Sequence, residues 1–265
     1  MVKIAVIGGS GVYDPDMLEN VRQAKVETPY GEVELQIGSY AGRETAFLAR
    51  HGTKHSIAPH RINYRANIYA LKKLGVRKII STTAVGSLNK AMQLGDFVLP
   101  NQFLDFTTGR ECTFFDGGER GVVHTDVTDP YCPELRSQIA EIGSRLNIHV
   151  INGGTYVCTN GPRYETPAEI RMYAMLGGDL VGMTNVPEVV LAQEAEMCYA
   201  TISMVTNMAA GISEHKLTHQ EVMDAMAANS QNFRSLIMTL LAELDPDEDN
   251  CECAHVLSGV GGFKL

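Results

Sequence analysis

The sequence is short of positive charge and has no long hydrophobic run. Its 265 residues carry 22 Lys and Arg against 31 Asp and Glu, a formal net charge of -9. That balance argues against nucleic acid or an anionic membrane as partner, while local donors still allow a small anionic substrate. No apolar run approaches the ~18 residues of a membrane span, and the first one, residues 2–7, is too short for a signal peptide. We therefore expect a cytoplasmic protein.

Common catalytic motifs are also missing. Without a G-x-S-x-G elbow, a Ser–His–Asp hydrolase is not expected. His51, His55 and His60 do not form an H-E-x-x-H pair, which argues against metal catalysis. The glycine turn after residues 2–7 lacks both the G-x-G-x-x-G spacing of a dinucleotide fold and the Lys of a P-loop.

The six cysteines include no C-x-x-C pair. Cys158 and Cys198 lie in apolar contexts and are expected to be small core residues. Cys251 and Cys253 follow an acidic run, and we interpret them as two exposed thiols, with a strained redox pair as the alternative. A structural zinc site needs about four ligands, and only His255 stands near this pair in the sequence.

Predicted strands alternate with predicted helices along the whole chain. Apolar runs predict strands at 2–7, 78–82, 96–99, 148–152 and 156–159, and a hairpin at 27–40 and 44–49 turning at Gly42. Residues 83–87 are expected to form a turn, and 101–133 are irregular. Helical spacing predicts helices over 59–74, 133–146 and from Thr218 to 244, the last starting with a capping box. No linker or repeat interrupts the pattern, so we predict one α/β domain, residues 1–245, and a mobile tail, residues 246–265.

Hydroxyl and cationic residues gather where the predicted strands end. Ser10 lies in the first glycine turn, whose backbone N–H groups suit a phosphate, although such a turn is often only a connection. Arg50 and His51 follow the hairpin, in a basic stretch that is equally compatible with a solvated loop. Thr83 and Thr184 follow later strands. Strand ends line the ligand crevice of an α/β sheet, so these side chains are suited to holding an oxyanion without a metal.

Seven segments carry a common set of motifs, within a similarity that runs from about residue 4 to residue 242: GGSGVYD, RHGTKHSIAPHRINYRANI, TTAVGSL, GDFVLP, RGVVHTDVTDPYCPELR, GTYVCTNGPRYETPAEI and GMTNVPEVVLAQEAEMCYATISMVTN. Together they resemble the purine nucleoside phosphorylase and methylthioadenosine phosphorylase family. The resemblance implies a single α/β domain with a central mixed sheet flanked by helices, assembled as a homotrimer or homohexamer. It also implies phosphorolysis of a purine nucleoside to free base and pentose 1-phosphate, with inorganic phosphate as co-substrate and no cofactor or metal.

The resemblance also implies roles for particular residues. By motif, it assigns the phosphate site to Ser10, Arg50, His51, Thr83, Ala84 and Thr184. Met183 matches the residue that packs against the ribose, and Tyr164 matches the aromatic residue over the purine ring. His124 matches a position that reaches into the sugar pocket of a neighbouring subunit, which would make the oligomer part of the active site.

The choice of purine depends on Glu165 and Asn207, which we expect to be the catalytic residues. The Asn207 amide has two N–H donors for O6 and N7 of a 6-oxopurine, and an ionised Glu165 accepts from N1–H. In adenine the 6-amino group is a donor and N1 is an acceptor, so both positions are reversed. A mismatched buried polar pair costs roughly 1–3 kcal/mol. Adenine-directed members of the family carry Asp at the position of Asn207 and again two residues later, where this chain has Ala209. We therefore expect a 6-oxopurine.

The 5′ substituent of the sugar is less constrained. His219 falls near the position where members that read a 5′-hydroxyl place a histidine, but it is equally compatible with a first-turn helix residue that makes no substrate contact. We expect inosine and guanosine to be the substrates in purine salvage. The alternatives are 5′-methylthioinosine or methylthioadenosine phosphorolysis, a hydrolase that uses water, and a nucleoside-binding protein without activity.

Overall fold

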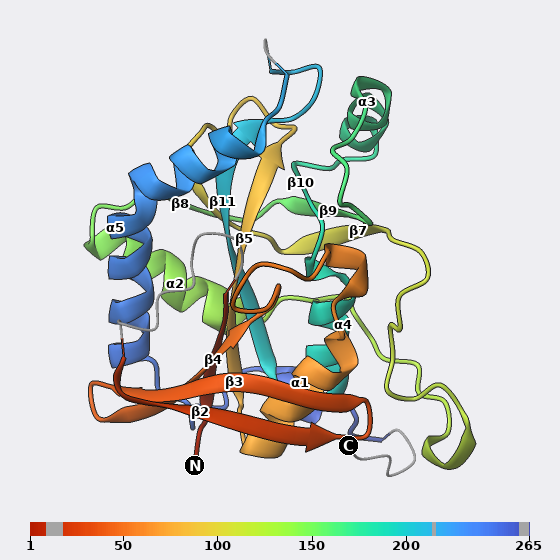
Figure 1. Cartoon of the computed structure of the whole chain (residues 1–265), viewed down its shortest axis with the longest axis vertical. Coiled ribbons are helices and arrows are strands. Elements are labelled where there is room, and N and C mark those ends of the chain that lie inside the picture. The colour runs from red at the N-terminus through yellow and green to blue at the C-terminus, as the bar shows by residue number, and fades with distance from the viewer. Residues whose placement is uncertain (9–17, 214–215, 260–264) are drawn as a thin grey trace.

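The structure, a computed structural model, describes residues 1–8, 18–213, 216–259 and 265 (Figure 1). In this part of the chain, eleven strands form one mixed sheet, and helices cover both of its faces. The predicted fold, an α/β domain with a central mixed sheet, is confirmed. No helix among the described residues is long and apolar enough to cross a membrane.

The strands are β1 (Ile4–Gly8), β2 (Glu19–Thr28), β3 (Gly31–Tyr40), β4 (Arg43–Ala49), β5 (Lys78–Ser87), β6 (Phe97–Leu99), β7 (Gln102–Phe106), β8 (Val150–Asn152), β9 (Thr155–Thr159), β10 (Leu180–Gly182) and β11 (Cys198–Met208). The helices are α1 (Tyr64–Leu74), α2 (Pro133–Arg145), α3 (Pro167–Met175), α4 (Asn185–Glu194) and α5 (His219–Glu243), with short 3-10 turns η2 (Pro59–Arg61), η3 (Gly118–Arg120) and η4 (Glu252–His255). The main path of the sheet runs β2-β3-β4-β1-β5-β10-β9-β7, and β11 joins β5 to β6 and β8.

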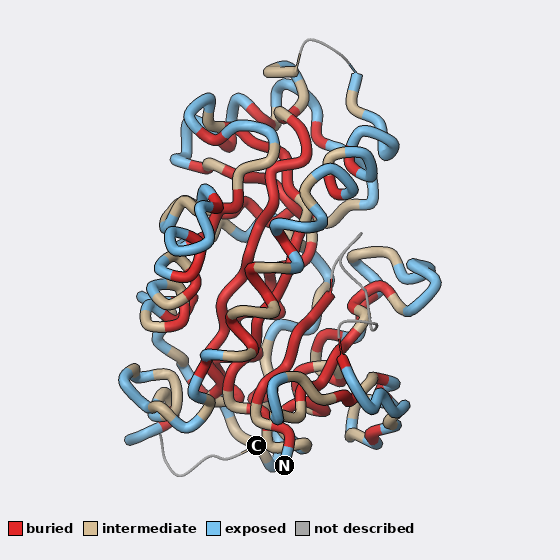
Figure 2. Tube along the Cα trace, turned by 90° about the vertical axis from the view of Figure 1, so that its left-hand side faces the viewer, coloured by how far each residue is buried: buried red, intermediate tan, exposed pale blue. Residues whose placement is uncertain are grey.

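Two long parallel strands, β5 and β11, form the centre of the sheet (Figure 1). Both are buried along nearly their whole length and carry the β-branched residues that suit a strand covered on both faces (Figure 2). Helices α2 and α5 pack against each other and against β11 in one core cluster. Helices α1 and α4 pack together in the other large cluster. The result is three layers, helix, sheet and helix.

Two local predictions are wrong. Residues 83–87 are not a turn, because β5 continues to Ser87 and stays paired with β11 as far as Met208. The helix predicted from residue 59 begins only at Tyr64, where the Asn63 side chain accepts the Ala66 N–H and caps the first turn. The three residues from Pro59 form η2 instead.

Other local predictions are confirmed or extended. Strands β3 and β4 pair antiparallel around the turn at Gly42, and α5 starts with the capping box of Thr218 and Glu221. Strand β2, which no prediction covered, pairs with β3 and lengthens the sheet. Strand β7 lies inside the stretch we described as irregular.

The described part of the tail folds back on the domain. Lys3 donates to Asp247 at 2.7 Å, Arg77 donates to the same carboxylate at 3.1 Å, and Leu257 is buried. Cys251 and Cys253 are half-buried, so the interpretation of two exposed thiols is wrong. The expected burial of Cys158 and Cys198 is confirmed.

Candidate active site

A cavity of about 430 Å³ opens beside the middle of β5. Eleven of the thirteen residues predicted for the site line it: Arg50, His51, Thr83, Ala84, Tyr164, Glu165, Met183, Thr184, Asn207, Ala209 and His219. His124 is exposed and is not among the lining residues. Ser10 lies outside the described residues. The strands therefore bring together side chains that are up to 169 positions apart in the sequence, from Arg50 to His219.

Strand polarity explains why these residues meet. Parallel strands β4 and β5 flank β1, and β4 ends just before Arg50 and His51, while β5 continues past that level. Strand β10 then runs antiparallel against the far half of β5, with Val181 opposite Gly86. Its carboxyl end therefore returns toward Arg50 and delivers Thr184 to the same space.

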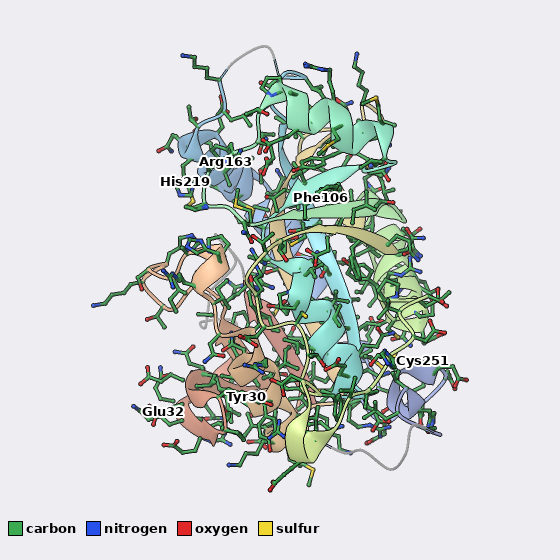
Figure 3. All side chains as sticks on the ribbon, turned by 90° about the vertical axis from the view of Figure 1, so that its right-hand side faces the viewer. Tyr30, Glu32, Phe106, Arg163, His219 and Cys251 are labelled. Atoms are coloured by element: carbon green, nitrogen blue, oxygen red, sulfur yellow. The ribbon has the colours of Figure 1, made fainter. Side chains whose placement is uncertain are left out.

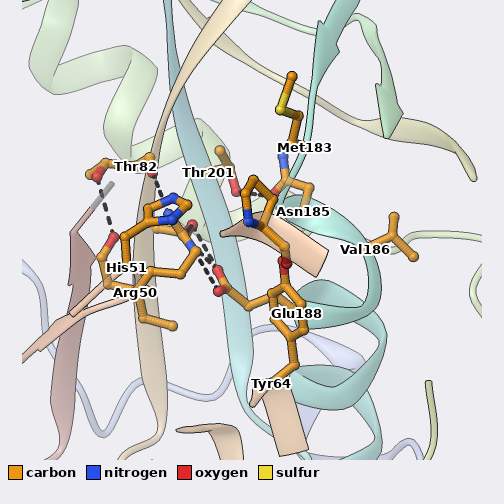
Figure 4. A network of polar contacts seen from close by, with 12 residues as sticks. Arg50, His51, Tyr64, Thr82, Met183, Asn185, Val186, Glu188 and Thr201 are labelled. Atoms are coloured by element: carbon orange, nitrogen blue, oxygen red, sulfur yellow. Dashed lines mark hydrogen bonds and ion pairs between the residues drawn. The ribbon is translucent and has the colours of Figure 1, made fainter. Parts of the chain in front are cut away.

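Arg50 is the most deeply buried charged residue of the cavity, with only 1% of its surface exposed. Its Nε and Nη2 donate to both carboxylate oxygens of Glu188 at 2.6 and 2.7 Å, and Nη1 and Nη2 donate to Thr82 O and Ser81 Oγ (Figure 4). Burial lowers the pKa of Arg50, but the charge and hydrogen bonds of Glu188 more than offset this and leave the pKa above its ordinary value. Four of the five guanidinium N–H groups are therefore used inside the protein.

Glu188 is a residue that the sequence reasoning missed. It is fully buried on α4, and its Oε1 accepts from the Ser81 hydroxyl at 3.0 Å and from the Tyr199 hydroxyl at 2.7 Å, besides Arg50. The available signal was a carboxylate, Glu188, within the largely apolar segment NVPEVVLAQE, which ends in a second one, Glu194. A buried charge requires a partner, so that pattern pointed to an internal cation.

His51 is neutral, whereas the basic stretch around it suggested a cation. Its Nδ1 lies 2.8 Å from Ile57 O, and because a carbonyl only accepts, Nδ1 carries the proton and Nε2 is an acceptor in the neutral ring. Burial, the largest cause, lowers the pKa of His51 to about 4, and the nearby charge of Arg50 acts in the same direction. The ring is therefore neutral near pH 7.

Two threonines add hydroxyl groups beside Arg50 and His51. Thr83 is buried on β5, with its Oγ1 3.0 Å from Ser203 Oγ on β11. Thr184 precedes α4 at the N-cap position, and its side chain makes no capping hydrogen bond. Because Val186 has extended backbone angles, the regular turns of α4 begin after it, and the Thr184 hydroxyl itself is what this segment offers to an anion.

Glu165 and Asn207 also line the cavity. The Glu165 carboxylate accepts from Thr159 Oγ1 at 2.8 Å, and burial is the main cause that raises the pKa of Glu165. Asn207 Oδ1 accepts from Thr206 Oγ1 at 3.0 Å, and Nδ2 donates to Met208 O at 3.0 Å. One of the two amide N–H groups is therefore used internally, and one remains for a ligand.

Gly86 determines how closely the Asn207 amide can approach β5. A Cβ atom at residue 86 would lie 3.1 Å from Asn207 Nδ2 and 3.2 Å from Val181 Cγ1. The ladder between β5 and β11 also shifts register between Val205 and Asn207, where a bulge reorients the side chains. The position of the amide therefore depends on a glycine and a bulge that motif matching does not show.

Aromatic side chains line the opening of the cavity. The Tyr164 ring is 37% exposed and forms part of the lining. His55, which was not among the predicted site residues, lies between the His51 ring at 4.5 Å and the His219 ring at 6.5 Å. Three imidazoles thus extend from buried His51 to exposed His219, which is labelled in Figure 3.

Arg110 holds the backbone of the cavity wall, and its role was also missed. Its guanidinium donates to the carbonyls of Thr159 and Asn160, both at 3.2 Å, and to those of Met183 and Val186 at 2.9 and 2.5 Å. These carbonyls belong to the segments that follow β9 and β10. Arg110 comes from the irregular stretch 101–133, where nothing in the local sequence indicates which segments it contacts.

Comparison with known proteins agrees with this fold. The sequence profile of the phosphorylase superfamily matches residues 3–242. The chain is 57% identical to a probable 6-oxopurine nucleoside phosphorylase of Moorella thermoacetica, with 96% of this chain and 97% of the relative covered. It is 52% identical to the 6-oxopurine nucleoside phosphorylase of Pyrococcus furiosus, with 99% and 100% covered.

A solved structure extends the comparison to three dimensions. The structure of a methylthioadenosine phosphorylase from an Antarctic soil metagenomic library superposes with a TM-score of 0.90 at 37% identity, covering 97% of this chain and 91% of that one. The protein belongs to the phosphorylase superfamily. Within that superfamily, it is similar to the nucleoside phosphorylases.

Proposed function

We propose that the protein is a 6-oxopurine nucleoside phosphorylase, which converts inosine or guanosine and phosphate into free base and ribose 1-phosphate. The observation that carries this proposal is the orientation of the Asn207 amide. Its Nδ2 donates one N–H to Met208 O, and the Thr206 hydroxyl lies 3.0 Å from its oxygen, so the second N–H of Nδ2 remains as a donor for the base. A donor beside the Glu165 acceptor matches O6 or N7 together with N1–H of a 6-oxopurine.

The other end of the cavity is suited to phosphate. The remaining Arg50 N–H, the hydroxyls of Thr83 and Thr184 and the backbone at Ala84 line one side of it. The neutral His51 offers Nε2 as an acceptor for a phosphate O–H or a sugar hydroxyl. Ser10 belongs to this proposed phosphate site by motif.

With phosphate at one end of the cavity and the purine at the other, the proposed reaction is phosphorolysis of the glycosidic bond. The C1′–N9 bond breaks, its electron pair leaves with the purine, and a phosphate oxygen forms the new bond to C1′. The phosphate anion stabilises the positive charge that develops on the sugar, while the Asn207 N–H meets the negative charge on the base. Tyr164 and Met183 also line the cavity, and we propose that they pack against base and ribose.

The wider assignments are part of the same proposal. We infer that the enzyme acts in purine salvage in the cytoplasm as a homotrimer or homohexamer, with no cofactor. His124 is exposed in the monomer, which is compatible with a role in the sugar pocket of a neighbouring subunit. His219, at the cavity mouth, is proposed to contact the 5′-hydroxyl.

A substrate panel with and without phosphate tests the proposal. Inosine, guanosine, adenosine, 5′-methylthioinosine and methylthioadenosine are each incubated with the enzyme, and released base is quantified. We expect phosphate-dependent release of hypoxanthine and guanine, with little adenine. Release without phosphate would indicate a hydrolase, and nucleoside binding without turnover would indicate a binding protein; either result contradicts the proposal.

The alternative substrate is a 5′-methylthio nucleoside, since the superposed relative is a methylthioadenosine phosphorylase. The apolar contacts that Leu217 and Val222 offer at the cavity lining favour this alternative, because a methylthio group gains from apolar surface. A higher kcat/KM for 5′-methylthioinosine than for inosine would establish it.

A further inference from the structure

Four cysteines meet at the amino end of β11, far from each other in the sequence. Cys132, Cys198, Cys251 and Cys253 place their Sγ atoms within 4.8 Å of one another. They come from the start of α2, the first residue of β11 and the turn that contains η4. We call this group the cysteine cluster.

Two members of the cysteine cluster lie on rigid elements. Cys132 is the N-cap of α2, and its backbone N–H donates to Tyr199 O at 2.9 Å, which ties the helix start to β11. Cys198 is the first residue of that strand, and both cysteines are buried. Ligands on a helix start and a central strand keep a fixed separation.

The other two members are brought in by the tail. Cys251 precedes η4 and Cys253 lies within it. The segment around them is anchored on one side by the ion pair of Lys3 and Asp247 and on the other by Leu257, whose N–H donates to Glu196 Oε1 at 3.2 Å. The tail therefore presents both thiols to the buried pair.

The spacing of the four sulfur atoms fits a tetrahedral metal ion better than a disulfide. Zinc–sulfur bonds of about 2.3 Å place the sulfurs of a tetrahedral site roughly 3.8 Å apart. The Sγ atoms of Cys198 and Cys251 are 3.4 Å apart, and every pair in the cluster lies within 4.8 Å. A disulfide needs about 2.05 Å.

The surroundings also suit a negatively charged metal thiolate. The Leu135 N–H donates to Cys132 Sγ at 3.4 Å, as outer-shell N–H groups do for metal-bound sulfur. Arg136 lies one helical turn after Cys132, and its Nε is buried with no hydrogen-bond partner within the described ranges. Arg136 is half-buried, with its Nη1 donating to Asn152 Oδ1 at 2.7 Å, and a cation one helical turn after Cys132 offsets part of the charge of four thiolates.

We propose that Cys132, Cys198, Cys251 and Cys253 bind one zinc ion as a structural tetrathiolate site that fastens the tail to the domain. The site is separate from catalysis, because Cys198 and Asn207 lie at opposite ends of β11, about 30 Å apart at ~3.3 Å per residue. Figure 3 likewise shows Cys251 at the opposite end of the molecule from His219. Its loss therefore affects stability and leaves the chemistry unchanged.

Metal analysis of the full-length protein, purified with reductant and without chelator, tests this. We expect about one zinc ion per chain in the wild type. Cys251→Ser and Cys253→Ser, which change half-buried residues and spare the core, should each lose most of it, whereas Cys112→Ser, an exposed cysteine outside the cluster, should keep it. Zinc loss should lower the melting temperature by at least about 5 °C while kcat at 25 °C stays within about twofold.

Two further measurements keep the proposal open to refutation even if a variant misfolds. Wild-type protein stripped of metal and given Co²⁺ should develop the visible bands of tetrahedral cobalt thiolate. Alkylation of the denatured, unreduced protein should modify all six cysteines. Modification of only Cys112 and Cys158 would mean that the cluster forms two disulfides and would overturn the proposal, as would six free thiols without bound metal.

Discussion

The two ends of the cavity are built in different ways. At the proposed phosphate end, Arg50 is buried with four hydrogen bonds to other parts of the protein, and His51 is neutral and bonded to a carbonyl. At the proposed base end, Glu165 accepts from one hydroxyl, and Asn207 keeps one N–H for a ligand. The first end is held in place by the core, and the second presents groups that a ligand completes.

Because the two ends are built differently, substitutions at them should have different effects. At the phosphate end, a substitution disturbs the buried network and therefore the fold. At the base end, a substitution changes which hydrogen bonds a purine can make, with little effect on the core. Stability and specificity should therefore respond to different sets of mutations, and five experiments test that separation.

The largest expected effect is on stability. Glu188→Ala leaves the Arg50 charge buried without its partner, which costs roughly 3–5 kcal/mol of unfolding free energy. Denaturant unfolding measures the loss. The matched control is Glu243→Ala, which removes the carboxylate from an exposed pair with Arg145 and should leave the midpoint within error of wild type. Similar losses in the two variants would show that the Arg50 network is not what stabilises this end.

Arg110→Met should have the next largest effect, on catalysis. The variant removes the donors that hold four carbonyls of the cavity wall, and small displacements of substrate-contacting segments cost about a hundredfold in kcat/KM. Steady-state kinetics with inosine and phosphate measure it. Arg171→Met on the exposed side of α3 is the control. If Arg110→Met keeps both KM values and kcat, Arg110 does not position the site.

Motif matching predicted residues at both ends of the cavity, but not the partners that hold them. Tyr164, Glu165 and Asn207 belong to such motifs and line the cavity, and so do Arg50 and His51. The partner of Arg50 could not be predicted, because Glu188 is 138 residues away and meets it only through the packing of α4. Arg110 was missed for the same reason.

In the fold, too, local patterns were predictable and contacts between distant segments were not. Alternating apolar segments predicted the α/β sheet, but not the length of β5, because whether residues 83–87 turn or continue depends on β11 lying alongside. The cysteine cluster is a third case. Sequence spacing gave Cys251 and Cys253 no partners, whereas the sheet and α2 bring Cys198 and Cys132 to them.

Asn207→Asp should change specificity by a smaller amount. A carboxylate accepts from the 6-amino group of adenine and loses the donor for O6, so the ratio of kcat/KM for adenosine over inosine should rise by about tenfold to a hundredfold, equivalent to roughly 1–3 kcal/mol. The unfolding midpoint should change little compared with Glu188→Ala. An unchanged ratio would contradict the role of Asn207 in selecting the base.

The smallest expected effect concerns pH and compares the two ends directly. Burial raises the pKa of Glu165, so as pH falls toward that value the carboxylate takes up a proton and loses its acceptor for N1–H. The kcat/KM for inosine should therefore decline on the acid side above the ordinary Glu range near 4.3, and Glu165→Gln should remove this decline. A decline that persists in Glu165→Gln would assign it to another group.

Anion binding at the proposed phosphate end should not change with pH over the same range. Because burial lowers the pKa of His51 to about 4, the ring stays neutral from pH 8 to pH 5, and binding of an anion should not gain from a new positive charge. Sulfate, a dianion throughout, is a suitable competitor of phosphate, and its inhibition constant should change by less than about twofold. Tighter inhibition below pH 6.5 that disappears in His51→Gln would mean that the imidazole is protonated in the complex. In that case the phosphate end, like the base end, would be completed by its ligand.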